Sequence, residues 1–587
     1  DYKEAFLFAL ENMELDEDID EFCRMLIMDF ENIQNYTKEP LYKEALAVLK
    51  RFSTPPFLEY FEDSRIIVPD IFVYKENGEI KVKINDDYFL SLSLTELWER
   101  FSFYGIRPLL YLFMIASFEK SGMNLKPEEA SAIMGIFASC LYLAALPGGW
   151  LADNYLGQKR AILLGALTIA FGHLCIAFSY FNNKIIFVGM VFLVIGTGLF
   201  KTCASVMVGM LYKKNDARRD SGFTLFYMCF NFGAFVAPLI CGFLQKEYGW
   251  HFGFGAGGIG MLLAVIIFYL KTMPDLKEFD EKVGIDSTWD RPSKKSKNAF
   301  YIIIVSGIVL LGAIFLILGG FIKLDAQVIN KNIILTILAC AGIYFLYLFA
   351  FTSLKIEEKR NLIIFIVLFL AAALFWSVYE QQYTSFNFFA EKLTDKTILN
   401  YEIPTIWFQS LGGLFVILFA PFSAFIWTIC AKNNKEISSI IKFALGLLGA
   451  ALAFLIMALA SNHAISLNGD ANTLRENLEN SSQIILVSPW WLVSSFLLMV
   501  LGELCLSPVG LSIMTKIAPN LIKSQVMGLW FVASALGNAL AGFIGGKASE
   551  ENIAYLPNLF YQCMWILLGA VIILLILKKP INKILKN

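Results

Sequence analysis

Seven ionisable residues lie inside long apolar runs of this sequence. Within a bilayer each charged side chain costs about 2.5 to 3.5 kcal/mol on insertion scales, so seven unpaired charges would cost on the order of 20 kcal/mol. These side chains must therefore contact one another, water or a ligand. The alternative to a functional role is that they form static ion pairs. The set holds four carboxylates and three cations: Glu96, Glu99, Glu380, Glu503, Arg100, Arg107 and Lys201.

The charge balance of this set indicates what it could bind. Four carboxylates against three cations leave one excess negative charge, which one added proton would neutralise. A zwitterionic ligand would leave that balance unchanged. The residue types alone therefore indicate proton coupling to a solute that carries both an amine and a carboxylate.

Four of the charges occur in the first apolar run, TELWERFSFYGIRPLLYLFM. At 3.6 residues per turn one helical face carries Glu96, Glu99, Arg100, Phe103 and Arg107. An exposed first helical turn, favoured by the helix dipole, is the alternative for the two carboxylates. Because Arg100 and Arg107 continue the same charged face further along the run, we favour the interpretation that this face is functional.

The other three charges lie deep in apolar runs. Lys201 lies in GTGLFKTCASVMVG, and Glu380 lies in ALFWSVYEQQYTSFNFF with Trp376 one turn before it. Glu503 lies in LMVLGELCLSPVG with Ser507 one turn after it. Charged residues inside a membrane span are by default candidates for a functional site.

The composition requires a membrane setting for these runs. Of 587 residues, 57% are hydrophobic, 15% aromatic and 17% charged, and the mean hydropathy is +0.61. Soluble domains are nearer a quarter charged and under half apolar. The net charge of −2 excludes a strongly basic nucleic-acid binder, so we expect no nucleic-acid partner for the membrane part.

The remaining reactive residue types predict no enzyme. The ten cysteines lie mostly in apolar stretches without metal-ligand spacing, and we interpret them as small buried hydrophobes. His173 stands alone in mid-span and is interpreted as a packed core residue. Without a nucleophile–base constellation or a metal cluster, we expect no catalysis and no cofactor besides the coupling proton.

From about residue 97 the chain is a series of apolar segments, each near the 20 residues that a membrane-spanning helix needs. An even number of spans places both termini on one side, and the loops richest in Lys and Arg predict that this side is cytoplasmic. We predict a multi-pass protein of the cytoplasmic (inner) membrane with about fourteen spans, near residues 97–117, 131–151, 161–181, 185–208, 222–245, 251–271, 300–322, 333–353, 362–389, 404–430, 437–460, 489–514, 524–546 and 558–577.

The loops divide these spans into bundles. Two six-helix bundles with the substrate between them form a transporter arrangement. Residues 1–90 differ: they are acidic and predict a small soluble α+β segment of amphipathic helices followed by a hairpin around Asn77-Gly78. The predicted parts after it are bundles at 93–272 and 361–578, a cytoplasmic linker at 273–299 and an extra helix pair at 300–353.

Several motifs give the membrane part a family resemblance. ELWERFSFYG, GGWLADNYLGQKRAI, FTLFYMCFNFGAF, FWSVYEQ, WFQSL, GELCLSPVGLS and MGLWFVASALGN follow one another over residues 93–578. In order and spacing they resemble the proton-dependent oligopeptide transporter family of the major facilitator superfamily. This resemblance implies an all-α polytopic fold with two six-helix bundles and, in bacterial members, two extra helices.

The resemblance also implies roles for individual residues. Glu96, Glu99 and Arg100 would couple proton movement to substrate, with Arg107 and Glu380 forming a pair between the halves that responds to protonation. Arg100 and Lys201 would attract the peptide carboxylate, and Glu503 would hold the amino group. The peptide site would be lined by Tyr104, Tyr142, Asn231, Trp376, Ser507 and Trp530.

The sequence departs from the family pattern near the implied peptide site. Gly412 and Gly413 replace an Asn-Pro pair whose Asn binds the peptide backbone, so we expect weaker peptide-bond recognition and a larger pocket wall. The other departures are Thr202 and Cys203 in place of Pro-Asn, Phe103 in place of a tyrosine, and Phe230 in place of a smaller residue.

The stretch VPDIFVYKENGEIKVKIND within residues 1–90 resembles the core-binding region of the nitrogen-regulation type of sigma factor. No DNA-reading element follows it, and we interpret residues 1–90 as a gene-fusion remnant or a mispredicted reading frame rather than as a working regulatory domain. We predict a proton-coupled importer of di- and tripeptides working by alternating access. One alternative is the same fold moving another small anion or amino-acid-like solute. The other is a membrane-tethered transcriptional regulator acting through residues 1–90.

Overall fold

The computed structural model describes residues 71–76, 79–84, 87–210, 217–277, 312, 325–352, 354–398, 400–432, 437–480, 483–518 and 525–585. The chain divides into two units, residues 1–68 and 69–587, and the second is described below. Three predictions lie outside the described residues: the amphipathic helices before the hairpin, the span at 300–322 apart from residue 312, and most of the linker at 273–299.

The predicted hairpin is present at the start of the second unit. Strands β1 (Ile71–Glu76) and β2 (Glu79–Ile84) pair antiparallel, with Glu76 opposite Glu79. The two residues between them in the sequence are Asn77-Gly78, a pair that two-residue hairpin connections favour. The alternation of apolar residues around this pair therefore identified the hairpin correctly.

Six helices form the N-terminal half of the membrane part, here called the N-half. Helix α5 packs against α9 and α10, while α8 packs against α6 and α7. A π-helical turn, Ala152–Leu156, extends α6 into the loop before Gly157, whose φ of +79° suits glycine. The six helices are α5 (Asp87–Ile115), α6 (Pro127–Leu151), α7 (Gln158–Ala177), α8 (Ile185–Met210), α9 (Ala217–Tyr248) and α10 (Trp250–Ile267).

The C-terminal half, here called the C-half, begins with a broken helix. After α14 the chain tightens into the 3-10 turn η5, continues into α15, and forms a small hairpin of strands β3 and β4. Its elements are α14 (Ile356–Tyr379), η5 (Glu380–Tyr383), α15 (Ser385–Leu393), β3 (Thr397–Ile398), β4 (Tyr401–Glu402), α16 (Trp407–Lys432), α17 (Ser439–Leu467), α18 (Ala471–Glu479), α19 (Trp490–Ile517), α20 (Val526–Gly545) and α21 (Leu556–Leu585).

Twelve helical segments of the described residues are long and apolar enough to cross a membrane. Helix α5 is 29 residues long but is not among the twelve, because Glu96, Glu99, Arg100 and Arg107 interrupt its apolar run. Helix α13 (Ala326–Phe351) is the second member of the predicted extra pair and packs against α6 and α20. The helical segments agree with the predicted spans wherever the two can be compared.

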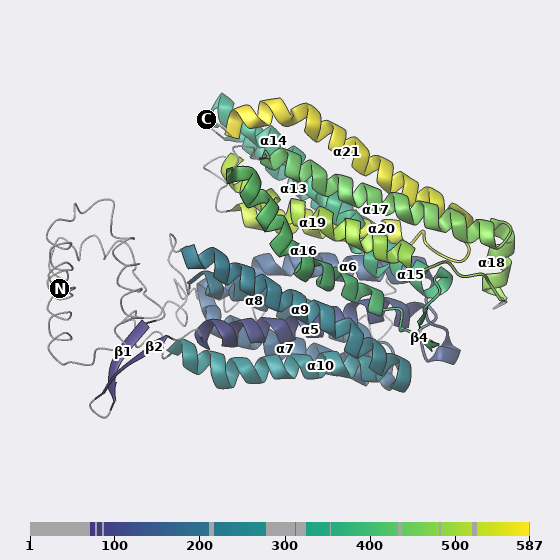
Figure 1. Cartoon of the computed structure of the whole chain (residues 1–587), viewed down its shortest axis with the longest axis horizontal. Coiled ribbons are helices and arrows are strands. Elements are labelled where there is room, and N and C mark those ends of the chain that lie inside the picture. Colours follow the sequence, from purple (N-terminus) through teal and green to yellow (C-terminus); the bar gives the residue numbers. More distant parts are fainter. Residues whose placement is uncertain are drawn as a thin grey trace. The chain divides into compact units, whose positions relative to one another are not determined.

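The two halves meet along helices that approach one another closely. In Figure 1 the N-half lies below the C-half, and α6 contacts α20 while α9 contacts α16. A Cβ on Gly413 of α16 would lie 2.7 Å from the backbone nitrogen of Phe235 on α9. A Cβ on Gly135 of α6 would lie 2.8 Å from Cα of Gly542 on α20. Glycine is therefore required at both crossings, as is usual where membrane helices touch.

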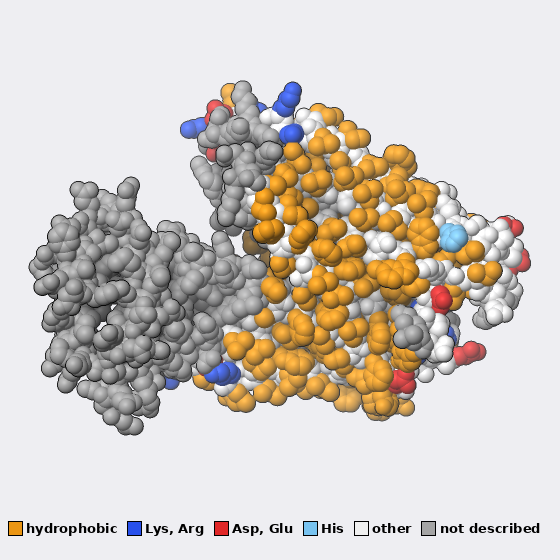
Figure 2. All heavy atoms as spheres, viewed as in Figure 1, with side chains coloured by type: hydrophobic (Ala, Val, Ile, Leu, Met, Phe, Trp, Pro, Cys, Tyr) orange, Lys and Arg blue, Asp and Glu red, His pale blue; other side chains and the backbone are white. Residues whose placement is uncertain are grey.

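The outer surface agrees with a membrane setting. On the face shown in Figure 2, hydrophobic side chains form a broad band over the helices, and charged side chains gather at its two ends. Exposed apolar residues such as Ile343 on α13 and Ile576 on α21 are 68% and 71% exposed. A contiguous apolar surface of this kind is a membrane contact rather than a soluble exterior.

Two details of the sequence interpretation need correction. The polar sequence of residues 462–482 predicts an outward loop, but the described residues of this stretch contain the end of α17 and helix α18. Asp470 caps α18 by accepting a hydrogen bond from the Thr473 N–H at 2.9 Å, which holds the pKa of Asp470 below its usual value. Cys340 was expected to be buried but is exposed, because α13 turns most of its surface outward.

Candidate functional site

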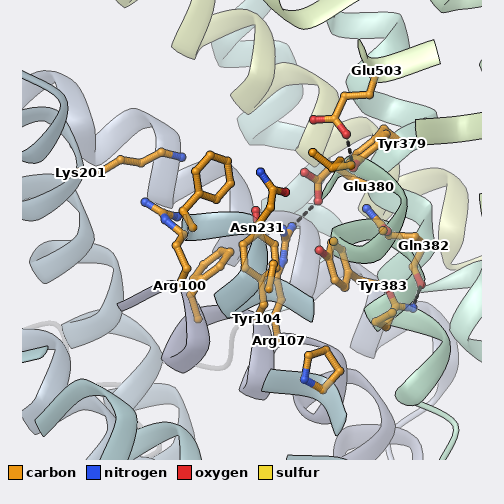
Figure 3. A pocket seen from close by; sticks show the side chains of 18 of the residues that line it. Arg100, Tyr104, Arg107, Lys201, Asn231, Tyr379, Glu380, Gln382, Tyr383 and Glu503 are labelled. Atoms are coloured by element: carbon orange, nitrogen blue, oxygen red, sulfur yellow. Dashed lines mark hydrogen bonds and ion pairs between the residues drawn. The ribbon is translucent and has the colours of Figure 1, made fainter. Parts of the chain in front are cut away.

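A cavity of about 260 Å³ lies between the two halves. Its walls come from α5, α6, α8 and α9 of the N-half and from α14, η5, α16 and α19 of the C-half. Figure 3 shows charged side chains from both halves converging on it. The predicted site residues that line it are Glu96, Arg100, Tyr104, Arg107, Tyr142, Lys201, Asn231, Trp376, Glu380 and Glu503.

Helix α5 carries a buried triad of one cation and two carboxylates. Arg100 Nε lies 2.8 Å from Oε1 of Glu96 and 3.0 Å from Oε2 of Glu99. The Arg100 guanidinium also lies 5.9 Å from the ring centroids of Phe103 and Phe230. Glu96 and Glu99 are 5% and 1% exposed, and α5 begins at Asp87. The alternative of an exposed first helical turn is therefore wrong.

A second ion pair joins the two halves. Arg107 of α5 donates to Glu380, the first residue of η5, and also donates to Oδ1 of Asn538 on α20 at 3.1 Å. Its guanidinium lies 4.2 Å from the Tyr383 ring centroid. Both charged side chains are about 5% exposed. The structure thus contains the ion pair between Arg107 and Glu380 that was predicted from the sequence.

Opposite charges face the cavity from the two halves. Lys201 of α8 places Nζ 4.2 Å from the Tyr142 ring centroid. On the C-half side, Oε2 of Glu503 accepts a hydrogen bond from the Tyr379 hydroxyl at 2.6 Å. Among the described residues no cation lies within ion-pair distance of Glu503. A ligand amine could supply that missing positive charge.

Contacts between the halves also occur at the end of the bundle near β4. Tyr401 Oη donates to Oε1 of Glu247 on α9 at 3.3 Å, and Trp407 Nε1 donates to the Leu239 carbonyl at 3.0 Å. Asn387 of α15 donates to the Pro108 carbonyl of α5 at 3.2 Å. The end that carries the β3–β4 hairpin therefore holds the two halves together.

Two predicted peptide-site residues lie outside the cavity lining. The Trp530 ring packs against Gly510, where it occupies the space that a Cβ would need. The Ser507 hydroxyl is buried without a hydrogen-bond partner in the described structure. Trp530 of α20 therefore packs against α19, and neither residue contributes to the lining of this cavity.

The cavity also uses residues that the sequence interpretation missed. Tyr379, Gln382 and Tyr383 line it beside Glu380, and Gln409 contributes from α16. Their signal was weak, because consecutive residues of one regular helix point in different directions. The change from α14 to η5 at Glu380 tightens the backbone and brings these neighbours to one wall.

His173 takes the packed position that its sequence context predicted. It is 2% exposed, and its Nε2 forms a hydrogen bond with the Ser102 hydroxyl of α5. The residue lies outside the cavity lining. The pair joins α7 to α5 inside the N-half, which is a structural role.

Two packed helical halves with a charged cavity at their interface define a membrane transporter. Residues 159–555 match the POT family, and residues 1–98 match the core binding domain of the sigma-54 factor. The second match extends into α5 as far as Trp98. The chain belongs to the POT family, whose members are transporters and not enzymes.

Individual relatives are similar over nearly their full length. The peptide transporter YePEPT of Yersinia enterocolitica is 48% identical over 84% of this chain and 94% of its own. A di-/tripeptide transporter of Lactococcus lactis subsp. cremoris is 34% identical over 84% and 96%. A crystal structure of a peptide transporter POT in complex with sulfate superposes with a TM-score of 0.75, at 32% identity, over 90% of this chain and 99% of that one.

Proposed function

We propose that this protein imports di- and tripeptides together with protons by alternating access. The observation that carries this proposal is the charge arrangement of the cavity. Cations from the N-half, Arg100 and Lys201, face Glu503 of the C-half across a space of peptide size. A short zwitterion satisfies both ends at once, and the relatives named as peptide transporters support this substrate class.

The two ion-pair systems divide the work within this proposal. Glu96, Glu99 and Arg100 form the proton-coupling triad, since a ligand carboxylate at Arg100 competes with their carboxylates for the same guanidinium. Arg107 and Glu380 connect the halves, so breaking their pair frees one half to rock against the other. Tyr104, Tyr142, Asn231 and Trp376 form the walls between these charges.

The proposal includes a location and an orientation. The protein lies in the cytoplasmic (inner) membrane with both termini on the cytoplasmic side. This orientation is favoured by the basic stretches between the predicted spans, at 213–220, 271–297 and 355–360, because short cytoplasmic connections carry an excess of Lys and Arg. Protons and lipid are then its other partners, and the domain boundaries predicted from the sequence are kept as part of the proposal.

Uptake into proteoliposomes tests the function directly. Purified protein should accumulate a labelled dipeptide inside vesicles when an inward proton gradient is imposed. Without the gradient, the dipeptide should only equilibrate. Vesicles that accumulate an inorganic or amino-acid-like anion but no dipeptide would favour the rival in which the same fold moves another solute.

Blocking either end of the peptide should weaken binding. An N-acetylated dipeptide leaves Glu503 without a cation, and a C-amidated one leaves the N-half cations without a carboxylate. Removing one partner of a buried charge pair costs about 2 to 5 kcal/mol, so inhibition by either capped dipeptide should be at least about 30-fold weaker. In Glu503→Gln the penalty for acetylation should shrink while that for amidation stays. Equal inhibition by capped and free dipeptides would defeat the charge assignment.

The match of residues 1–98 to a sigma-54 core binding domain favours a second candidate function. In this candidate a membrane-tethered regulator binds RNA polymerase through residues 1–90 while the membrane part senses peptide. We expect deletion of residues 1–86, just before α5 begins at Asp87, to leave proton-driven uptake unchanged. Altered transcription of a reporter on deletion supports the regulator, and unchanged transcription and uptake together contradict it.

A further inference from the structure

One wall of the cavity differs from the charged remainder. It is formed by the facing sides of α9 and α16, and none of the described residues that these helices contribute to the lining is charged. Its two amides turn their N–H groups to backbone: Asn231 donates to the Tyr227 carbonyl and Gln409 to the Gln382 carbonyl, both at 2.7 Å. The rest of the wall is apolar or glycine: Phe226, Phe230, Ala234, Pro238, Gly412, Gly413 and Val416.

The two glycines of this wall play different parts. Gly413 faces α9, since a Cβ there would lie 2.8 Å from the Asn231 carbonyl oxygen. Gly412 faces the cavity. Among the described residues, the nearest atom to its Cβ position beyond its own stretch of helix backbone is Oε1 of Gln382, at 3.9 Å. Gly413 is thus needed for helix packing, whereas Gly412 leaves a hollow that a side chain could fill.

The position of the hollow follows from the helix geometry. Gly413 fixes α16 at the level of Asn231 on α9, so the α9 lining residues nearest this level are Asn231 itself, Phe230 and Ala234. On α16 the next lining residue after Gly412 is Val416, one turn on and 3% exposed.

We propose that Gly412 opens a subsite for an apolar side chain of the transported peptide. Phe230, Ala234 and Val416 form its apolar sides, and the Gln382 amide oxygen lies at its edge. The inference rests on the proposed function and adds a specificity determinant to it. The charges at the two ends of the cavity hold the peptide termini, while this wall takes the side chain. Apolar burial against it favours bulky hydrophobic side chains over alanine.

Substitutions that fill the hollow test the subsite. Inhibition of labelled dipeptide uptake by Ala-Ala, Ala-Phe and Phe-Ala is measured in vesicles holding the parent, Gly412→Ala or Gly412→Leu. Gly412→Leu should weaken at least one of the phenylalanine dipeptides about ten- to a hundredfold relative to Ala-Ala, which is the expected effect of losing the burial of a large apolar side chain. Gly412→Ala should shift the ratio less and in the same direction.

The matched control is Gly342→Leu on α13. A Cβ there also meets nothing within 4 Å, and the position lies outside the cavity lining, so all three inhibition constants should keep their parent ratios. Parallel losses for the three dipeptides in both Gly412 variants overturn the subsite while leaving the proposed function standing. If Gly412→Leu does not fold, Gly412→Ala decides, because its methyl group fits without displacing a neighbour. A parent that binds none of the three dipeptides overturns the proposed function itself.

Discussion

Glu99→Gln should abolish accumulation of dipeptide against a gradient while exchange of labelled for unlabelled dipeptide continues. Glu99 is 1% exposed and lies 3.0 Å from Arg100 Nε, so its charge depends on that guanidinium. A peptide carboxylate that pairs with Arg100 draws it away from Glu99. The Glu99 carboxylate then loses this partner while it remains buried, which favours proton uptake by Glu99. Glutamine keeps the shape and polarity of the side chain but can neither take up nor release a proton.

The exchange measurement separates coupling from binding. Arg100 keeps Glu96 as a partner at 2.8 Å in this variant, so the cavity should still bind peptide and exchange needs no net proton movement. Glu119→Gln is the control, because Glu119 is an exposed carboxylate of the short 3-10 turn after α5. A Glu99→Gln protein that concentrates dipeptide as well as the parent does would show that the proton is carried elsewhere.

The sequence could predict the spans because hydrocarbon imposes one simple requirement on each. A segment must be near 20 residues long and apolar, so α17 or α21 is evident from hydropathy alone. Helix α5 is the informative exception. Its charged residues interrupt the apolar run that hydropathy detects, and the same residues predicted that the helix belongs to the site. The buried positions of Glu96 and Glu99 exclude an exposed first helical turn, and their role in the site stays a prediction.

Other parts of the site were beyond sequence reasoning because they depend on contacts between distant segments. Asn538 accepts from Arg107 across 431 residues of sequence, and an asparagine in an apolar run has many possible partners. Tyr379 reaches Glu503 only because α14 packs against α19. Ser507 and Trp530 show the converse, since both were predicted to line the peptide site and neither contributes to the cavity lining.

Neutralising Arg107 or Glu380 should slow transport about a hundredfold or more while changing dipeptide affinity less than about tenfold. The two side chains are buried and come from opposite halves, and removing one partner of such a pair costs about 3 to 5 kcal/mol through the charge left behind. In Arg107→Gln that charge is Glu380. In Glu380→Gln it is Arg107, which keeps Asn538 and the rings of Tyr383 and Phe103 beside it. This free-energy cost falls on the conformation in which the two residues pair. We therefore expect the rate of the transport cycle to fall more than the affinity for dipeptide.

The charge-swapped protein, Arg107→Glu with Glu380→Arg, distinguishes a cross-half pair from two independent charges. It should recover part of the transport that each single neutralisation loses, because attraction between the halves is restored although the contact to Asn538 is not. Lys392→Gln is the matched control: its ion pair with Glu550, at 2.5 Å, is half-exposed and joins two segments of the C-half. Since that pair does not change partners when the halves move, its loss should leave the transport rate unchanged. Parent-like turnover in both single neutralisations would remove Arg107 and Glu380 from the gate and leave closure to the contacts around the β3–β4 hairpin.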